Sequence, residues 1–384
     1  MRGLLLAISS LTIMAGSTIA PGLPGMRESF SDLPGADALV RLVLTLPALF
    51  IGLAAGPVGA LLDRVGRVRM LAISLALYVT AGTSGIWVGS LPLLLVGRAI
   101  LGIAIAGVMT ATSTIIGDAF VGSARSRYLG LQSAFMAFGG VLFLSVGGLL
   151  ASIGWRAPFF VYLLGVPLVP MALMVLGGAP GTRASEAPRG PRAQVPWRAI
   201  ALPCAAAFMG MALFSLVPVQ IPFLLRQTGF GGPAVTGGAI ATLTLTGGIA
   251  SLQFRRLATR VSREAIAALT FGLMALGYVV VAVAPNLSTV VLGLALAGLG
   301  TGLIMPNTNE WTMHATHGAQ RPGALGVLNA CLFGGQFISP LLFAPFLTLA
   351  SLQTLFGVAA AVLCTTAAVF LSVPRTLPSL GPRR

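Results

Sequence analysis

The sequence has no lysine and few charged residues. Only 8% of the 384 residues are charged, and all 23 basic residues are arginines. Without lysine the chain has neither a GxxxxGK[ST] nucleotide-binding loop nor a Schiff-base lysine, so we expect no ATP hydrolysis by the chain itself. The three cysteines, Cys204, Cys331 and Cys364, occur singly and without a CxxC motif. This predicts packing roles for them, and neither a disulfide framework nor a thiolate metal site.

The sequence also lacks a nucleophile elbow, a specific metal-ligand spacing, a cofactor loop and a soluble domain. These absences predict that the protein is not an enzyme and holds no cofactor and no metal.

Apolar residues make up 56% of the chain, which predicts an integral membrane protein. The apolar runs are continuous and about 20 residues long, which favours membrane-spanning helices over the shorter alternating strands of a barrel. The first run, with Arg2 and a small-residue end, also resembles a cleaved signal peptide. Twelve runs are found, at 3–22, 39–61, 68–89, 91–116, 128–151, 157–177, 199–224, 236–254, 265–285, 288–313, 323–348 and 352–373.

The net charge of +15 reflects membrane topology rather than nucleic-acid binding. If the N-terminus is cytoplasmic, 18 arginines fall on the inner side, four on the outer side and one, Arg98, within a span. The four outer ones are Arg27, Arg41, Arg156 and Arg226. This bias predicts cytoplasmic termini and no nucleic-acid partner.

A duplication divides the chain. The Pro- and Arg-rich segment 178–198 is predicted to be a cytoplasmic linker between a six-helix bundle at 1–177 and another at 199–384. A shift of 196 residues pairs Arg64 and Arg67 with Arg260 and Arg263, and Gly102 with Gly298. Because six spans return the chain to its starting side, the halves should be parallel repeats related by a pseudo-twofold axis along the membrane normal. The repeat argues against removal of the first run as a signal peptide.

A charged loop follows the second predicted span. It reads GPVGALLDRVGRVR over 56–69, with Asp63 and three arginines in seven positions. With twelve spans in two halves, this loop resembles the signature of the major facilitator superfamily. The resemblance covers essentially the whole chain and implies that family's fold and transport by alternating access.

The resemblance implies that this loop is a gating latch that stabilises an outward-facing state. By this resemblance the gating role falls on the loop residues Gly59, Asp63, Arg64, Gly66, Arg67 and Arg69. The alternative is a topological anchor, for which the arginines suffice but an acid has no use. The second half has Thr259 for Asp63 and Ser262 for Gly66, so any latch there is expected to be degenerate.

Three charged residues are candidates for ion coupling or for binding substrate charge: Arg98, Asp118 and Glu310. Arg98 resembles the fourth-span arginine of the family, and the alternative is that it snorkels to the outer interface. Glu310, with His314 and His317, should occupy one helical face, either as a titrating or metal-binding cluster or as a polar helix end. Only Glu310 and Asp118 are predicted to be carboxylates within spans.

Six uncharged polar residues are candidates for a substrate cavity. They lie among Met and Phe residues, which suits a hydrophobic or weakly polar solute. They are Gln132, Gln220, Asn307, Asn309, Asn329 and Gln336.

The chain also resembles the short-looped drug and metabolite exporters of the family. This resemblance implies a monomeric, multi-pass transporter of the bacterial inner membrane that exports hydrophobic or drug-like molecules with a coupling proton. One alternative is an importer or uniporter of a small metabolite or organic anion. Another, from a different class, is a receptor or scaffold on the same fold that transports nothing.

Overall fold

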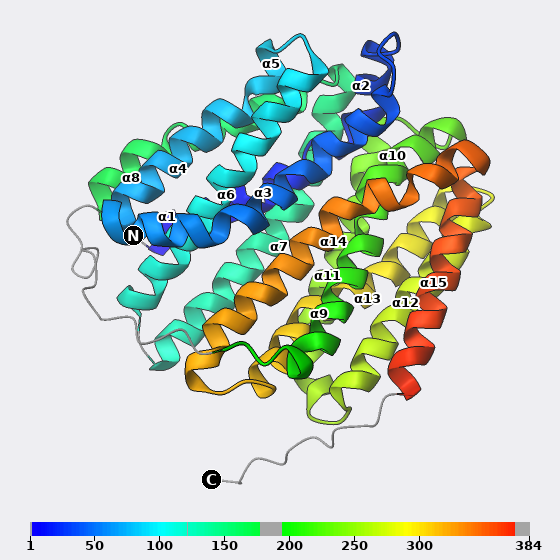
Figure 1. The fold of residues 1–384 in the computed structure, drawn as a ribbon. Coiled ribbons are helices and arrows are strands. Elements are labelled where there is room, and N and C mark those ends of the chain that lie inside the picture. Colours follow the sequence, from blue (N-terminus) through cyan, green and yellow to red (C-terminus); the bar gives the residue numbers. More distant parts are fainter. Residues whose placement is uncertain (1, 121, 177–193, 373–384) are drawn as a thin grey trace. The chain divides into compact units, whose positions relative to one another are not determined.

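The computed structural model describes residues 2–120, 122–176 and 194–372. The described residues form helices joined by short loops, without a strand among them (Figure 1). Most of the predicted linker (178–193) lies outside the described residues, as do Arg375, Arg383 and Arg384 and the side chains of Arg2, Asp63, Arg125 and Arg127.

Eleven helical segments of the described chain are long and apolar enough to cross a membrane, and each coincides with a predicted run. They are Ala36–Leu62, Arg67–Trp87, Leu91–Ala119, Ala134–Ile153, Ala157–Leu176, Trp197–Gln227, Pro233–Ala258, Arg263–Ala282, Leu287–His314, Gly318–Phe346 and Leu352–Ser372. The remaining predicted run contains α1, an apolar helix of 16 residues, Arg2–Ser17.

Contacts divide the chain into two compact units. The first takes the described residues up to 176 together with Pro218–Ala241, and the second takes 194–217 together with 242–372. The division of the sequence at 178–198 into two six-helix bundles stays a prediction.

The described part of the first unit is built from ten helical elements, together with α10 and the beginning of α11. Its elements are α1 (Arg2–Ser17), η1 (Ala20–Gly22), α2 (Leu23–Ser29), α3 (Ala36–Val65), α4 (Arg67–Gly82), α5 (Ser84–Trp87), α6 (Leu91–Ala119), α7 (Gly122–Ile153), η2 (Ala157–Gly165), α8 (Leu168–Leu176), α10 (Leu216–Gln227) and the start of α11 (Pro233–Ala258).

The second unit contains the rest of α11 and the helices that follow it, together with α9. Its elements are α9 (Trp197–Phe214), α12 (Arg263–Ala282), α13 (Leu287–His314), η3 (Gly318–Gln320), α14 (Arg321–Leu349) and α15 (Leu352–Ser372). The seventh predicted span is therefore two helices, α9 and α10, which meet at Ser215 and belong mainly to different units.

The same pairing of helices occurs in both units. In the first, α6 packs on α3 and α4, α1 packs on α7, and α4 packs on α8. In the second, α13 packs on α12, α9 packs on α14, and α12 packs on α15 (Figure 1). This correspondence supports the duplication inferred from the sequence.

Glycines let the paired helices approach closely. A β carbon on Gly102 of α6 would collide with the carbonyl oxygen of Pro47 on α3, and one on Gly298 of α13 would collide with that of Leu243 on α11. The shift of 196 residues relates these two contacts. Small residues at helix crossings favour association in lipid, where the hydrophobic effect between helices is absent.

A tyrosine makes a corresponding bond in each unit. The hydroxyl of Tyr78 on α4 donates to the carbonyl oxygen of Leu11 on α1, and that of Tyr278 on α12 donates to the carbonyl oxygen of Leu213 on α9. Both rings are fully buried, so each hydroxyl needs such an acceptor.

Gly277→Ala should destabilise the second unit, because the added methyl group would collide with the backbone of Gly293 and Ala297 on α13. We expect a loss of about 1–3 kcal/mol, as for overpacked cores, measured as a lower midpoint of thermal unfolding in detergent. Gly272→Ala on the same helix is the matched control, since no atom lies within 4 Å of its added β carbon. Equal midpoints for the two variants would contradict this packing.

Candidate functional site: charged helix ends and buried arginines

The signature loop is a one-residue break between two helices. Helix α3 ends at Val65, α4 begins at Arg67, and Gly66 between them has a φ of 90° and a ψ of 149°. This conformation is open to glycine and costly for other residues. Gly59, about two turns earlier in α3, has no such constraint, because no atom lies within 4 Å of an added β carbon. The backbone conformation therefore requires glycine at position 66 but not at position 59.

Arg67 forms the ion pair of this loop. Its guanidinium is buried and contacts the carboxylate of Asp118, which lies at the end of α6 and is about a third exposed (34%). Arg64 and Arg69 are exposed. The structure thus brings together one loop residue and one coupling candidate, and the role predicted for Asp63 rests on the sequence.

The second unit has a corresponding pair. Arg263 begins α12, and its Nε lies 4.0 Å from Oε1 of Glu310 on α13. Asn307 is buried one turn before Glu310 and donates to the carbonyl oxygen of Arg263 at 3.0 Å. The break before α12 is made differently, because Ser262 has a φ of −66° and its hydroxyl accepts a bond from the Ala265 amide at 3.4 Å. The sequence did not predict that the second half keeps an acidic partner for this arginine.

The predicted face of Glu310, His314 and His317 is only partly formed. His314 lies 3.8 Å from Glu310, at the last residue of α13. His317 was expected on the same face, but the helix ends before it, and its side chain caps η3 instead. The left-handed Gly318 (φ 34°) follows His317, so the helix stops earlier than the glycine suggested.

Arg98 is enclosed by aromatic side chains. Its side chain is fully buried, so it does not snorkel to the surface. Its Nη1 donates to the hydroxyl of Tyr162 at 2.9 Å, and its Nη2 donates to the carbonyl oxygen of Gly82 at 3.4 Å. The guanidinium carbon lies 4.6 Å from the centre of the Phe159 ring and 5.3 Å from that of Tyr162. Among the described residues no carboxylate pairs with it, so cation–π contacts and two hydrogen bonds stabilise the charge.

Glycines make room for the rings around Arg98. A β carbon on Gly82 would collide with Tyr162, and one on Gly85 would collide with Phe159. The cage therefore joins α6, the α4–α5 segment and η2 at one point. A coupling or substrate-charge role for Arg98 stays a prediction, and any bound anion would have to compete with these contacts.

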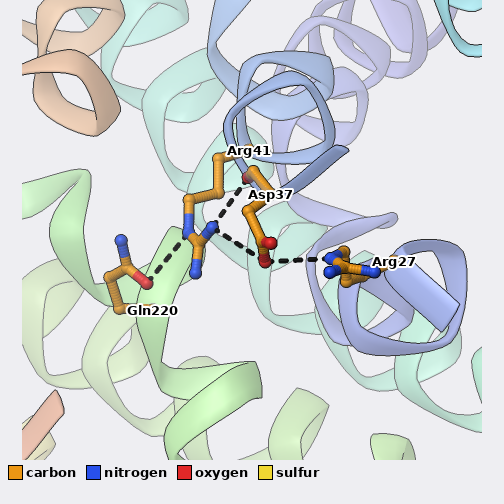
Figure 2. Close-up of polar contacts among 4 residues, drawn as sticks. All are labelled: Arg27, Asp37, Arg41 and Gln220. Atoms are coloured by element: carbon orange, nitrogen blue, oxygen red, sulfur yellow. Dashed lines mark hydrogen bonds and ion pairs between the residues drawn. The ribbon is translucent and has the colours of Figure 1, made fainter. Parts of the chain in front are cut away.

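Another buried arginine, Arg41, lies near the start of α3. Figure 2 shows Arg41 between Asp37 and Gln220, with Arg27 on the far side of Asp37. The Nε of Arg41 donates to Oε1 of Gln220 at 3.3 Å, and its Nη1 donates to the carbonyl oxygen of Asp37 at 2.7 Å. The guanidinium also lies 4.6 Å from the centre of the Phe223 ring.

The remaining charges of this cluster bind α2. Asp37 lies 2.9 Å from Nε of Arg27, and this hydrogen bond raises the pKa of Arg27 above its ordinary value. Arg226 on α10 pairs with Glu28 on α2. Five charged side chains and one amide therefore connect α2, α3 and α10 within the first unit.

Sequence reasoning missed two buried charges. It counted Arg41 as an outer-loop residue, although α3 begins five residues earlier and buries it. It placed only Glu310 and Asp118 in spans, whereas Glu264 is the second residue of α12 and is 1% exposed. The predicted span began at 265, which left Glu264 out.

The cavity candidates occupy different surroundings. Gln132 is half-buried and donates to Ser9 of α1 at 2.8 Å, and Gln220 is fully buried against Arg41. Asn307 is buried, Asn309 and Gln336 are half-buried, and Asn329 is exposed. The described contacts join none of the six to another. Within the described part of the chain no group of three or more His, Cys, Asp or Glu residues could hold a metal.

Comparison with known proteins identifies a family model that matches nearly the whole length of the chain. The family model described as Major Facilitator Superfamily matches residues 5–243 and 202–383. A curated relative is the quinolone resistance protein NorB of Staphylococcus aureus (strain JH9), 29% identical over 186 residues. That match covers 48% of this chain and 38% of the length of NorB.

Solved structures of transporters share the fold. A mutant of the peptide transporter POT superposes with a TM-score of 0.75 and 14% identity, covering 97% of this chain and 94% of that one. A POT family transporter in complex with 5-aminolevulinic acid gives 0.78 and 12%, covering 96% and 95%. A mutant of the nucleoside transporter NupG gives 0.76 and 14%, covering 97% and 99%. At these identities the likeness is one of fold.

Gly66→Ala should destabilise the protein by about 1–3 kcal/mol, because alanine is strained at this backbone conformation. Gly59→Ala, in the same motif, should leave the unfolding midpoint in detergent within error of the wild type. If Gly59→Ala proved as damaging as Gly66→Ala, the backbone at position 66 would not be the reason for glycine in this loop.

A double-mutant cycle should separate the two ion pairs. For Arg67→Gln with Asp118→Asn we expect a coupling energy of about 1–2 kcal/mol, because Arg67 is buried and Asp118 is only partly solvated. For Arg263→Gln with Glu310→Gln we expect less than about 1 kcal/mol at 4.0 Å. Both are measured as free energies of unfolding, with exposed Arg69→Gln as the control. A larger coupling in the second unit would contradict the described geometry.

Proposed function

Since the chain belongs to the major facilitator superfamily, we propose that this transporter moves a small organic solute by alternating access and exports hydrophobic or drug-like compounds in exchange for protons. The observation that carries the export proposal is the similarity to NorB, whose name is that of a quinolone resistance protein. The similarity covers half of this chain, so the substrate of NorB is a guide to the chemical class only.

The polar chemistry of the described helices supports an apolar substrate. The cavity candidates are amides, and three of them already bond within the protein: Gln132 to Ser9, Gln220 to Arg41, and Asn307 to the carbonyl oxygen of Arg263. The buried arginines have partners too, Arg98 in its aromatic cage and Arg41 beside Asp37. A solute with little charge would need no strong ionic partner, which fits this arrangement.

We propose that the charged helix ends act in the conformational cycle. Arg67 and Asp118 join α4 to α6, and Arg263 and Glu310 join α12 to α13. Charge-assisted bonds of this kind form and break at modest cost when they are partly solvated. In the signature loop, Asp63 remains the proposed latch residue that distinguishes gating from simple anchoring.

Glu310 is the preferred coupling residue. It is about a third exposed (32%) and has two basic neighbours, Arg263 and His314. Protonation of Glu310 would release Arg263, which gives a physical route from proton uptake to a change in helix contacts. Protonation of Asp118 would release Arg67 in the same way.

The rival proposal is an importer or uniporter of a small metabolite or organic anion. The likeness to peptide and nucleoside transporters keeps this proposal open, because these proteins share the fold. We place it second because Arg98, its expected anion partner, is fully buried with Tyr162 and Gly82 as hydrogen-bond partners. A receptor or scaffold that transports nothing is the remaining alternative.

The proposal includes the setting of the protein. We place it as a monomer in a bacterial inner membrane with both termini in the cytoplasm, on the strength of the arginine bias in the sequence.

Flux into proteoliposomes tests both transport and coupling. With an imposed pH gradient, the wild type should accumulate members of a panel of hydrophobic cations and neutral drugs. Glu310→Gln should lower this proton-driven accumulation at least about tenfold, because a coupling carboxylate that cannot titrate cannot link proton movement to transport. Exchange of labelled for unlabelled solute, which needs no net proton movement, should persist in the variant.

The two readouts distinguish the possible failures. A wild type that moves no solute under any gradient would overturn the transporter proposal. A Glu310→Gln variant with full proton-driven accumulation would remove Glu310 from the mechanism, and the same test of Asp118→Asn would then decide between the two carboxylates.

A further inference from the structure

Two of the three cysteines lie against each other. Cys204 is on α9 and Cys331 is on α14, and their side chains lie within hydrogen-bonding reach of each other. Both belong to the second unit, and neither is in a disulfide. In the sequence they are far apart and occur singly, so the pattern predicted packing roles alone.

The packing of α9 on α14 explains this contact. A β carbon on Gly335 would collide with the carbonyl oxygen of Phe208, and one on Gly323 would lie 3.1 Å from Val195. The later residue on one side, Gly335, meets the later residue on the other, Phe208. Residue numbers therefore rise in the same direction along both helices, which run parallel. Cys204 and Cys331 each lie four residues, about one turn, before Phe208 and Gly335. The close approach at Gly335 therefore brings the cysteines together in the same register.

The surroundings of the two cysteines do not suit a metal site. A structural zinc site needs four ligands, and no group of three or more candidate ligands occurs among the described residues. Cys204 is buried and Cys331 is partly exposed. A reagent can therefore reach one thiol first, with the second thiol already in place beside it.

We propose that Cys204 and Cys331 form an oxidisable dithiol, in which a hydroperoxide converts the two thiols into a disulfide that links α9 to α14. The thiolate of Cys331 attacks an oxygen of hydrogen peroxide, which breaks the O–O bond, gives a sulfenic acid and, after protonation, releases water. The sulfur of Cys204 then attacks the sulfur of Cys331, and the S–O bond breaks with loss of a second water. Two thiols lose two protons and two electrons in total, and one peroxide becomes two waters.

The disulfide would fix a helix pair that is otherwise held by packing. It would close a loop that contains α10 to α13, and closing long loops restricts the unfolded chain most. A small dithiol such as dithiothreitol would reverse it by thiol–disulfide exchange. The inference stands on the packing of the second unit alone and is independent of whether the protein exports its solute.

Thiol counting on the purified full chain tests the proposal. The folded protein in detergent is treated with hydrogen peroxide, denatured and alkylated with a maleimide that shifts its mass. Wild type should lose two of its three reactive thiols, and dithiothreitol should restore them. Peptide mapping should find the Cys204 and Cys331 peptides joined.

Substitutions identify the participants. Cys204→Ser and Cys331→Ser should each abolish the internal disulfide, whereas Cys364→Ser, at an exposed position on α15, should leave it unchanged. The proposal is overturned if peroxide leaves all three thiols of the folded wild type free, or if the disulfide involves Cys364. The wild-type peptide map alone decides the matter if a serine variant folds poorly.

Discussion

A charge that enters a helix of this chain must be satisfied by a neighbouring helix of the same unit. Arg67 and Arg263 stand at the starts of α4 and α12, and Asp118 and Glu310 stand near the ends of α6 and α13. Each of these charges has the unfavourable sign for the dipole of its own helix end. Helix stability therefore does not explain them, and mutual pairing does. Arg98 shows the other solution, in which aromatic faces and one carbonyl oxygen replace a carboxylate.

The two units keep the same contacts with different residues. Gly102 and Gly298 perform the same close approach, and Tyr78 and Tyr278 each tie the third helix of a half to its first. The turn before α4 relies on a positive φ at Gly66, whereas the turn before α12 relies on the hydroxyl of Ser262. The acidic partner of the arginine also differs in position. Under the shift of 196 residues Asp118 corresponds to position 314, and Glu310 lies about one turn before it. Duplication has thus preserved interactions more strictly than residue types.

Much of the fold follows from the sequence, because uninterrupted apolar runs of about 20 residues leave few alternatives to spanning helices. The duplication was also readable, since glycines at helix crossings cannot be replaced without collision. The pairing of charges was not readable. Arg41 was counted with the outer arginines although the predicted run 39–61 already contained it. Glu264 lies at a helix end, where a shift of a few residues in a boundary changes loop into buried helix. The break at Ser215 and the early end of α13 before His317 escaped for the same reason. The contact of Cys204 with Cys331 depends on the register between two helices, which periodicity within one helix does not reveal.

The aromatic cage of Arg98 has a consequence for biosynthesis. Tyr162 follows Arg98 by 64 residues, so at about 5–20 residues per second the ribosome needs about 3–13 s to supply it. During that interval α6 must enter the membrane with a guanidinium that has only the carbonyl oxygen of Gly82 within reach. An arginine at the centre of an inserting helix costs about 2.5–3.5 kcal/mol. Arg98 lies in the first third of α6, so this figure is an upper bound, and the strongly apolar remainder of α6 must offset the cost until η2 is inserted. The first half of the protein therefore completes its insertion cooperatively, because the sixth span supplies the aromatic partners that Arg98 in the fourth span lacks until then.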